Sequence, residues 1–234
     1  MSKFLALLLT LLPVAAGADG LPSAPYIEVS GHGELHVAPD LAYVNLTLEK
    51  TSMDAKAARA DVESRAAKVI ALARRLGIAE KDIKAPAVTV YPQYEWHQTP
   101  SGDGKQVLVG QHVTRSISLT LRDLSRYGAL ADGLFAAGVT RLDNVVPDRG
   151  DRDQLQLQAL AQAVQDAHGK AEALAAAAGV TLGAVYRISE QEGSRGPRPM
   201  MMAAARSAGG QEPEFLSGEI EIDADVAAYY LIGH

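Results

Sequence analysis

The chain has 234 residues, with 28 Asp and Glu against 22 Lys and Arg, a formal net charge of −6 and no cysteine. An acidic chain with scattered cations lacks the basic patch of a nucleic-acid-binding protein, and without cysteine it forms no disulfide and offers no thiol chemistry. Only 5% of the residues are aromatic, which argues against a surface for stacking sugars or bases.

The first residues have the three-part layout of a secretory signal peptide. Lys3 precedes an apolar run that continues to residue 12, Pro13 breaks it, and Ala16-Gly17-Ala18 has the A-x-A form of a cleavage site. The run is too short to span a bilayer, which takes about 20 residues. We therefore expect residues 1–18 to be cleaved after Ala18 and residues 19–234 to be exported without a membrane anchor.

The mature chain begins with two predicted strands. Residues 26–37 alternate between two prolines, and Gly31 and Gly33 within them suggest a bulge or a close backbone approach. Pro39-Asp40 is typical of a tight turn, and residues 41–51 alternate again. The pair is predicted to be an antiparallel hairpin.

Two helices and three strands are predicted next. Ser52 is the expected cap of the first helix and Gly77 its stop, with one buried face formed by Val62, Ala66, Val69, Ala73 and Leu76. Strands are expected over 83–92, 106–121 and 141–146, with a turn or mobile tip at 99–105. Asp123 should cap the second helix and Gly138 should end it. Its inward-facing residues are expected to be Tyr127, Leu130, Leu134 and Phe135.

Residues 151–178 predict one long helix that begins at Asp151 and ends before Gly179. Apolar residues recur at alternating steps of three and four, which places them on one face: Leu157, Leu160, Val164, Ala167, Ala171, Leu174 and Ala178. This spacing also fits a heptad seam for a second helix, but an Ala-rich stripe favours close packing on a sheet.

Strands over 184–190 and 217–232 close the chain, separated by a predicted mobile loop at 192–214. Each of the three helices ends in Gly followed by an apolar residue, and each is followed by a strand. The order ββαββαβαββ predicts an α+β fold, with three helices packed on a mainly antiparallel sheet.

No residue is assigned a catalytic, cofactor-binding or metal-binding role. His32 and His36 share a strand face but lie roughly 13 Å apart, too far to ligate one metal together, so His97 or His112 would have to complete a site. His112 and His168 are read as surface or partly buried residues. Residues 148–153 resemble a calcium loop superficially, but they lack its distal Glu and fit the start of a helix.

The motifs of nucleophile elbows, P-loops and zinc proteases are absent from the sequence. Three readings of Met200-Met201-Met202 remain open: a contact for partners, a target of oxidants, or a loop tip without a role.

Three segments resemble the SIMPL-domain family of bacterial periplasmic proteins. They are residues 27–34 leading to Pro39-Asp40-Leu41-Ala42, residues 116–124, and residues 163–183 with their Asp166-Ala167-x-x-Lys170-Ala171-Glu172 core. The resemblance extends to Gly218 at the start of the last strand. Gln111 departs from it, because family members often carry an aromatic residue there.

The resemblance implies a periplasmic protein with a mixed α/β fold. Some members resemble subunits of ring-shaped homo-oligomers, the family is linked to oxidative and envelope stress, and one branch comprises immunogenic antigens. It implies no catalytic residue. We therefore expect a homo-oligomer, possibly a ring, that binds or scaffolds in stress tolerance, without a cofactor and without nucleic acid.

Two alternatives remain open at this stage. One is a small-ligand or metal-binding protein with a cleft between the glycine-rich first strand and the 97–112 region. The other is a hydrolase with a dispersed site.

Overall fold

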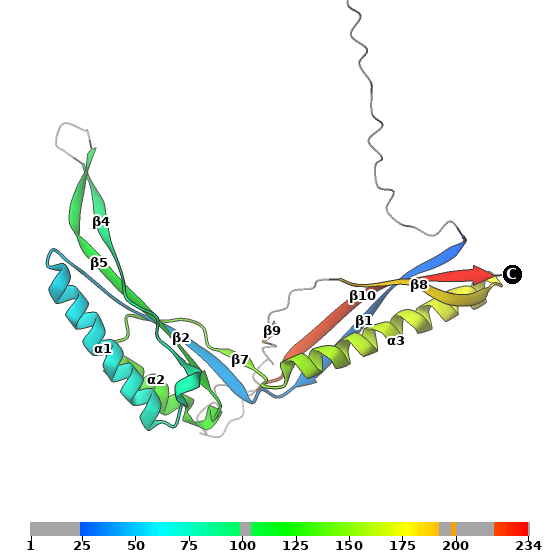
Figure 1. Cartoon of the computed structure of the whole chain (residues 1–234), viewed down its shortest axis with the longest axis horizontal. Helices are drawn as coiled ribbons and strands as arrows, with labels where there is room; N and C mark the ends of the chain where they lie inside the picture. Colours follow the sequence, from blue (N-terminus) through cyan, green and yellow to red (C-terminus); the bar gives the residue numbers. More distant parts are fainter. Residues whose placement is uncertain (1–23, 99–103, 192–197, 200–217, 234) are drawn as a thin grey trace, which may run out of the picture.

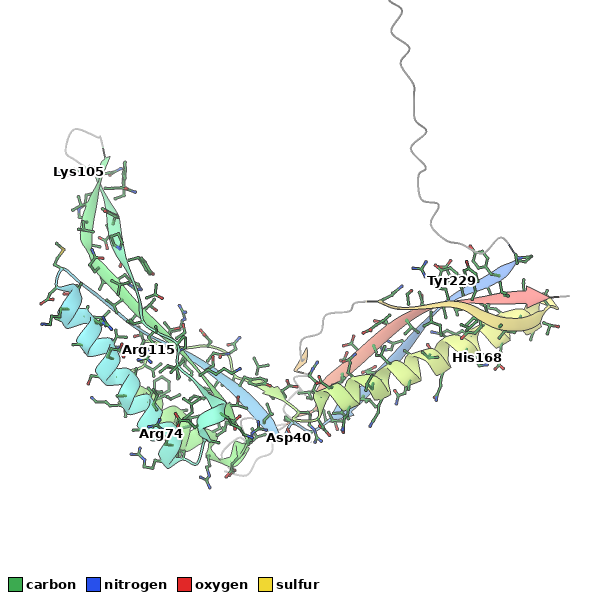
Figure 2. All side chains as sticks on the ribbon, viewed as in Figure 1. Asp40, Arg74, Lys105, Arg115, His168 and Tyr229 are labelled. Carbon is green, nitrogen blue, oxygen red and sulfur yellow. The ribbon has the colours of Figure 1, made fainter. Side chains whose placement is uncertain are left out.

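The computed structural model describes residues 24–98, 104–191, 198–199 and 218–233. The strands form two separate sheets, each covered by helix on one face, and the two halves meet near Asp40 (Figures 1 and 2). The α+β class and the three helices are confirmed, and the element order agrees roughly, but the strands divide between two sheets. The predicted signal peptide, Met200–Met202 and most of the predicted 192–214 loop lie outside the described residues.

The first half, which we call lobe A, holds the first and the last strands of the chain. Its sheet has the order β1 (Tyr26–Val37), β10 (Ile220–Gly233) and β8 (Thr181–Gln191), and β9 (Arg198–Pro199) also pairs with β10. Helix α3 (Arg152–Ala178) lies along one face of β1 and β10 (Figure 1). Among the described residues, no helix covers the opposite face of this sheet, which we call its open face.

Helix α3 has its predicted length, but its predicted face is only partly right, since Ala167 and Ala171 are buried and Leu160 and Val164 pack against the core. Leu157 and Leu174 are 67% and 50% exposed, whereas the buried residues follow one another at steps of four: Leu155, Ala159, Ala163, Ala167, Ala171 and Ala175. A step of four turns about 40° beyond a full turn, so this row winds around the helix. A winding row of small residues matches a twisted sheet, which a straight stripe cannot follow.

The alanine row permits a very close approach between α3 and β1. A Cβ atom built on Gly31 would lie 1.9 Å from the Ala163 carbonyl oxygen, and one on Gly33 would lie 2.0 Å from that of Ala159. Only glycine fits there, because real Cβ atoms never approach a backbone oxygen so closely. The close backbone approach predicted from these two glycines is confirmed.

The second half, lobe B, is formed by the residues between β1 and α3. Strands β2 (Leu41–Ser52) and β5 (Gly104–Leu121) are central, and β3 (Ile83–Lys84), β4 (Thr89–Gln98), β6 (Arg141–Leu142) and β7 (Val146–Asp148) pair with them. Helices α1 (Ala55–Arg75) and α2 (Tyr127–Ala136) cover one face, and the short 3₁₀ turns η1 (Glu80–Asp82) and η2 (Leu124–Arg126) complete it. This lobe has its own core, which includes Leu46, Val69 and Ile117.

The predicted β1–β2 hairpin is wrong. Strand β1 pairs along its length with β10, and β2 pairs with β5. The Pro39-Asp40 segment therefore carries the chain from one sheet to the other. Asp40 holds this crossing: its backbone N–H donates to the Asp148 carbonyl at 3.0 Å, and its carboxylate accepts from the Gly150 N–H at 2.7 Å.

Smaller differences have local causes. The N-cap of α1 is Asp54, which accepts from the Ala57 N–H, while the Ser52 hydroxyl accepts from the Asp54 N–H. Phe135 points outward and is 67% exposed. The strand expected over 83–92 is divided between β3 and β4. The three glycine stops are confirmed, because Gly77, Gly138 and Gly179 have φ of 79°, 80° and 70°.

Candidate functional surfaces

The histidines of the first strand lie on the open face of the lobe A sheet. His32 Nδ1 lies 2.9 Å from Asp225 Oδ1 on β10, and Glu34 Oε1 lies 2.5 Å from His36 Nε2. The hydrogen bond with Asp225 raises the pKa of His32 above its usual 6.5, because the carboxylate stabilises the protonated ring.

His97 and His112 cannot complete a site with these histidines, because they lie on β4 and β5 in the other lobe. The expected cleft between the first strand and the 97–112 region is therefore wrong. The glycine face of β1 is instead filled by α3. Within the described ranges, no three His, Asp or Glu side chains are placed to hold a metal ion.

Asp166 and Lys170, which carried the family resemblance, bind the outer edge of β1. Asp166 Oδ2 accepts from the His32 backbone N–H at 2.9 Å, and Lys170 Nζ donates to the Ser30 carbonyl at 3.1 Å. Lys170 also lies 2.6 Å from Asp166, and this contact lowers the pKa of the Asp166 carboxyl. The pair occupies edge groups that would otherwise attract a foreign strand.

His112 belongs to a polar cluster on the open face of lobe B. Its Nδ1 lies 2.9 Å from the Thr51 hydroxyl and its Nε2 lies 3.5 Å from Glu49. The arrangement resembles a hydroxyl, an imidazole and a carboxylate in series, but the Thr51 hydroxyl donates to Gln93 Oε1 at 2.9 Å. The hydroxyl proton is thus directed away from the imidazole, which would have to accept it in nucleophilic catalysis. The cluster ties the base of β4 to β2.

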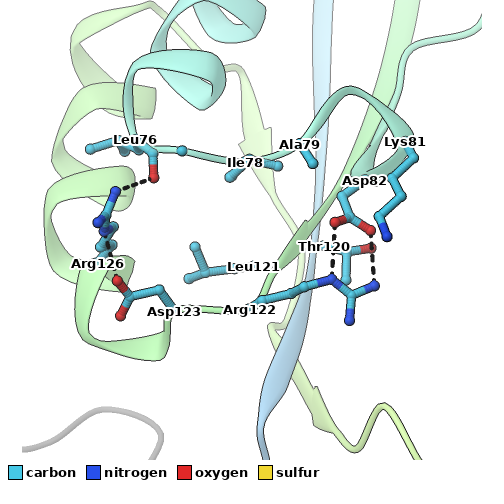
Figure 3. Close-up of a pocket in the computed structure, with 11 residues that line it drawn as sticks. Leu76, Ile78, Ala79, Lys81, Asp82, Thr120, Leu121, Arg122, Asp123 and Arg126 are labelled. Atoms are coloured by element: carbon cyan, nitrogen blue, oxygen red, sulfur yellow. Dashed lines mark hydrogen bonds and ion pairs between the residues drawn. The ribbon is translucent and has the colours of Figure 1, made fainter.

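A pocket of about 300 Å³ lies where α1 ends beside η1 and η2 (Figure 3). Its two arginines are each paired with a carboxylate. Arg122 makes two hydrogen bonds to Asp82, at 3.0 and 3.1 Å, and lowers the pKa of that buried carboxyl. Arg126 donates to Asp123 and to the Leu76 carbonyl, both at 2.7 Å. The pocket could hold a small anion beside these guanidinium groups.

The β4–β5 hairpin extends beyond the helices of lobe B, and Lys105 marks its far end (Figure 2). Trp96 and Tyr94 are 66% and 54% exposed. They lie two residues apart on β4, so they share one face, and the register places Leu108 opposite Tyr94 on that face. We call Tyr94, Trp96 and Leu108 the hairpin face.

Sequence reasoning missed this face, because the low overall aromatic content hid a local concentration. The signal was present in the segment Tyr91-Pro92-Gln93-Tyr94-Glu95-Trp96, which holds the only tryptophan of the chain.

Among the described residues, no helix combines the length and apolar character needed to cross a membrane.

Comparison with known proteins gives one consistent relationship. The family model described as SIMPL, a protein of unknown function (DUF541), matches residues 27–230. "Uncharacterized protein YggE" of Edwardsiella ictaluri is 32% identical over 82% of this chain and 79% of its own length. The protein of the same name from Escherichia coli K12 is 29% identical over 95% of this chain and 89% of its own.

A third relative carries a location in its name. The "26 kDa periplasmic immunogenic protein" of Brucella melitensis is 28% identical over 82% of this chain and 76% of its own length. The family match covers both lobes, including the Asp166–Lys170 pair and the glycines beneath α3. The chain therefore belongs to the SIMPL family.

Proposed function

We propose that this protein is a periplasmic, self-assembling homo-oligomer that acts by binding or scaffolding and not by catalysis. The hairpin face is the observation that carries the proposal. Tyr94, Trp96 and Leu108 are exposed on the β4–β5 hairpin, which extends beyond the helices of lobe B, so they add little to the core. Aromatic side chains exposed on a protruding element are typical of protein interfaces, where Trp and Tyr contribute most of the binding energy.

Location and physiological role rest on other support. The predicted signal peptide and the printed name of the Brucella relative support the periplasm. The proposed role in tolerance of envelope or oxidative stress comes from the family resemblance alone. Deleting the gene should therefore lower survival under peroxide or envelope stress, and a plasmid copy should restore it.

The test of assembly is the mass of the mature protein by light scattering during size-exclusion chromatography. We expect a discrete multiple of the subunit mass. The double variant Tyr94→Ser, Trp96→Ser should assemble more weakly, with an apparent dissociation constant at least tenfold higher than that of the unaltered protein. Phe135→Ser, at an equally exposed aromatic position on α2, should leave the mass unchanged. A strictly monomeric protein over a broad concentration range would end the assembly proposal.

A second candidate function is the binding of a small anion in the pocket of Figure 3. Three cationic residues, Lys81, Arg122 and Arg126, line it with the two carboxylates that pair with the arginines. A ligand that binds only the native state raises the unfolding temperature by mass action. Small dicarboxylates and inorganic phosphate should therefore shift this temperature, and Lys81→Met should abolish the shift. Unchanged melting with every anion would exclude this candidate.

The hydrolase alternative stays a prediction. A covalent probe for activated hydroxyl nucleophiles should label Thr51 if the His112 cluster is catalytic, and labelling should disappear in His112→Gln.

A further inference from the structure

Charge is distributed very unevenly between the two lobes. Lobe B, residues 41–98 and 104–148, contains 14 Lys and Arg against 11 Asp and Glu, a formal net charge of +3. The described residues of lobe A, 24–40, 149–191, 198–199 and 218–233, contain 5 Lys and Arg against 12 Asp and Glu, a net charge of −7. The overall charge of −6 conceals this separation, and such a molecule is a strong electric dipole.

The negative charge of lobe A is concentrated on the open face of its sheet. Glu34 on β1 stands directly opposite Asp223 on β10, and Glu221 and Asp225 lie two residues to either side of Asp223 on the same face. We call these four carboxylates the acidic face. Like charges opposite one another on a sheet are destabilising unless a cation intervenes. Among the described residues, the ion-pair partners of this face are the imidazoles of His32 and His36.

The positive charge of lobe B is concentrated on the outer side of α1. Lys56, Lys68 and Arg75 are exposed on this helix, opposite the face that packs Val62, Ala66 and Val69 into the core. Their neighbours Arg65 and Arg74 are paired with Asp61 and Glu80. Lys56, Lys68 and Arg75 form no ion pair within the described part of the chain, so we call them the basic face. They extend over about 28 Å of helix at 1.5 Å per residue.

We propose that the acidic face of one copy docks on the basic face of α1 in a second copy. In the part of the chain that the structure describes, the two faces lie on different lobes that join near Asp40, and they do not meet within one copy. A second copy supplies each face with a partner of opposite charge. Every copy carries one face of each kind, so the two kinds are present in equal numbers. The inference rests on the proposed self-assembly and deepens it, because it names the surfaces that meet.

The geometry of this contact has a consequence for the assembly. Two different surfaces meet, so each bound copy still offers one free acidic face and one free basic face. Such heterologous contacts repeat until the rotation closes a ring, or they continue as a filament. The hairpin face belongs to the same lobe as α1, so it can contribute apolar contacts to the same neighbour while charge sets the orientation.

The decisive experiment uses two charge-reversed versions of the mature protein. Variant one carries Lys68→Glu and Arg75→Glu, so both of its docking faces are acidic. Variant two carries Glu34→Lys, Glu221→Lys and Asp223→Lys, so its former acidic face has a formal charge of +2 and both of its docking faces are basic. In sedimentation velocity at low salt, each variant alone should have an apparent dissociation constant at least tenfold higher than that of the unaltered protein. An equimolar mixture should assemble again, because each copy then has neighbours of opposite charge.

Three comparisons make the result decisive. Asp132→Lys with Glu172→Lys changes the formal charge by four units, as variant one does with the opposite sign, at exposed positions outside both faces and should assemble normally. Circular dichroism should show that all variants are folded. Raising the salt from about 0.02 to 0.5 M should dissociate the unaltered oligomer, because the Debye length falls several-fold.

Each failure has its own signature. If the unaltered protein assembles but both variants assemble equally well, or if mixing does not restore assembly, the docking inference is wrong and self-assembly survives. If the unaltered protein is monomeric in every condition, the proposed function itself fails.

Discussion

Replacing Gly31 with alanine should destabilise lobe A far more than a glycine-to-alanine change in a strand usually does. The new Cβ would lie 1.9 Å from the Ala163 carbonyl oxygen and 2.7 Å from Ala167 Cβ. Ordinary contact begins near 3.4 Å, so α3 would have to retreat by about 1.5 Å. Both clashing partners belong to the helix, whose backbone cannot rotate away as a flexible side chain could.

The expected magnitude follows from this displacement. A gap of 0.5–1 Å already forfeits a quarter to a half of the dispersion energy of each contact, and a retreat of 1.5 Å would affect the whole alanine row. Overpacking a core usually costs about 1–3 kcal/mol. We therefore expect Gly31→Ala to lower the free energy of unfolding of lobe A by about 3 kcal/mol or more, at the upper end of that range.

Urea denaturation followed by far-ultraviolet circular dichroism measures this change. Gly169→Ala is the matched control, because it lies in α3 with nothing within 4 Å of its Cβ position. That variant should be stabilised by about 1 kcal/mol, since alanine is the better helix former. A loss of less than about 1 kcal/mol for Gly31→Ala would refute the close contact between α3 and β1.

Three further predictions test other contacts. Lys170→Met should leave the Ser30 carbonyl and the Asp166 carboxylate without their cation, so the free edge of β1 should become prone to pairing and the protein should aggregate sooner on heating, as turbidity would show. Lys50→Met, at an exposed position outside both docking faces, is the control. Because Asp225 raises the pKa of His32, the stability that this contact gives is fully present below pH about 6.5 and is lost as pH rises through the raised value; an NMR titration should find a pKa above 6.5 for His32, and Asp225→Asn should lower it. Because lobe B is a continuous segment with its own core, a fragment of residues 41–148 should fold cooperatively by itself, and a disordered amide spectrum would contradict that.

The local elements were predictable because their signals are local. Glycine stops, the length of α3 and the alternation of β5 follow from backbone preferences and residue periodicity within a few turns or pairs. The buried face of α1 was also predicted, since Val62, Ala66, Val69 and Ala73 repeat at helical spacing against a sheet. These patterns depend only on neighbours in the sequence.

The division into two lobes was not predictable from the same patterns. Strands β1 and β2 follow one another with a turn signal between them, and a local hairpin is the default reading of such a pair. The actual partner of β1 is β10, and Tyr26 pairs with Leu231 across nearly the whole chain. The local sequence contains no signal that the chain passes from one sheet to the other at Pro39-Asp40.

The face of α3 was misread for a physical reason. Large apolar residues were expected to point inward, so Leu157 and Leu174 were preferred to Ala159, Ala163 and Ala175. A sheet lined with Gly31 and Gly33 reverses this preference, because the close approach admits only small residues. The candidate surfaces were missed for a related reason, since exposure of Trp96 and the opposed charges of Glu34 and Asp223 depend on pairings distant in sequence.

The two lobes need different parts of the chain before their strands can pair. All strands of lobe B lie between β1 and α3 in the sequence, so this lobe can pair its strands without β10. Lobe A needs β10 between β1 and β8, and its central strand is therefore the last one in the chain. Non-local pairing of this kind is slow, because a long loop must close first. The outer edge of β1 has no strand partner among the described residues even after β10 has joined, and Asp166 and Lys170 on α3 cover part of it. Protection of this edge explains why the polar pair belongs to α3 and faces a backbone and not a pocket.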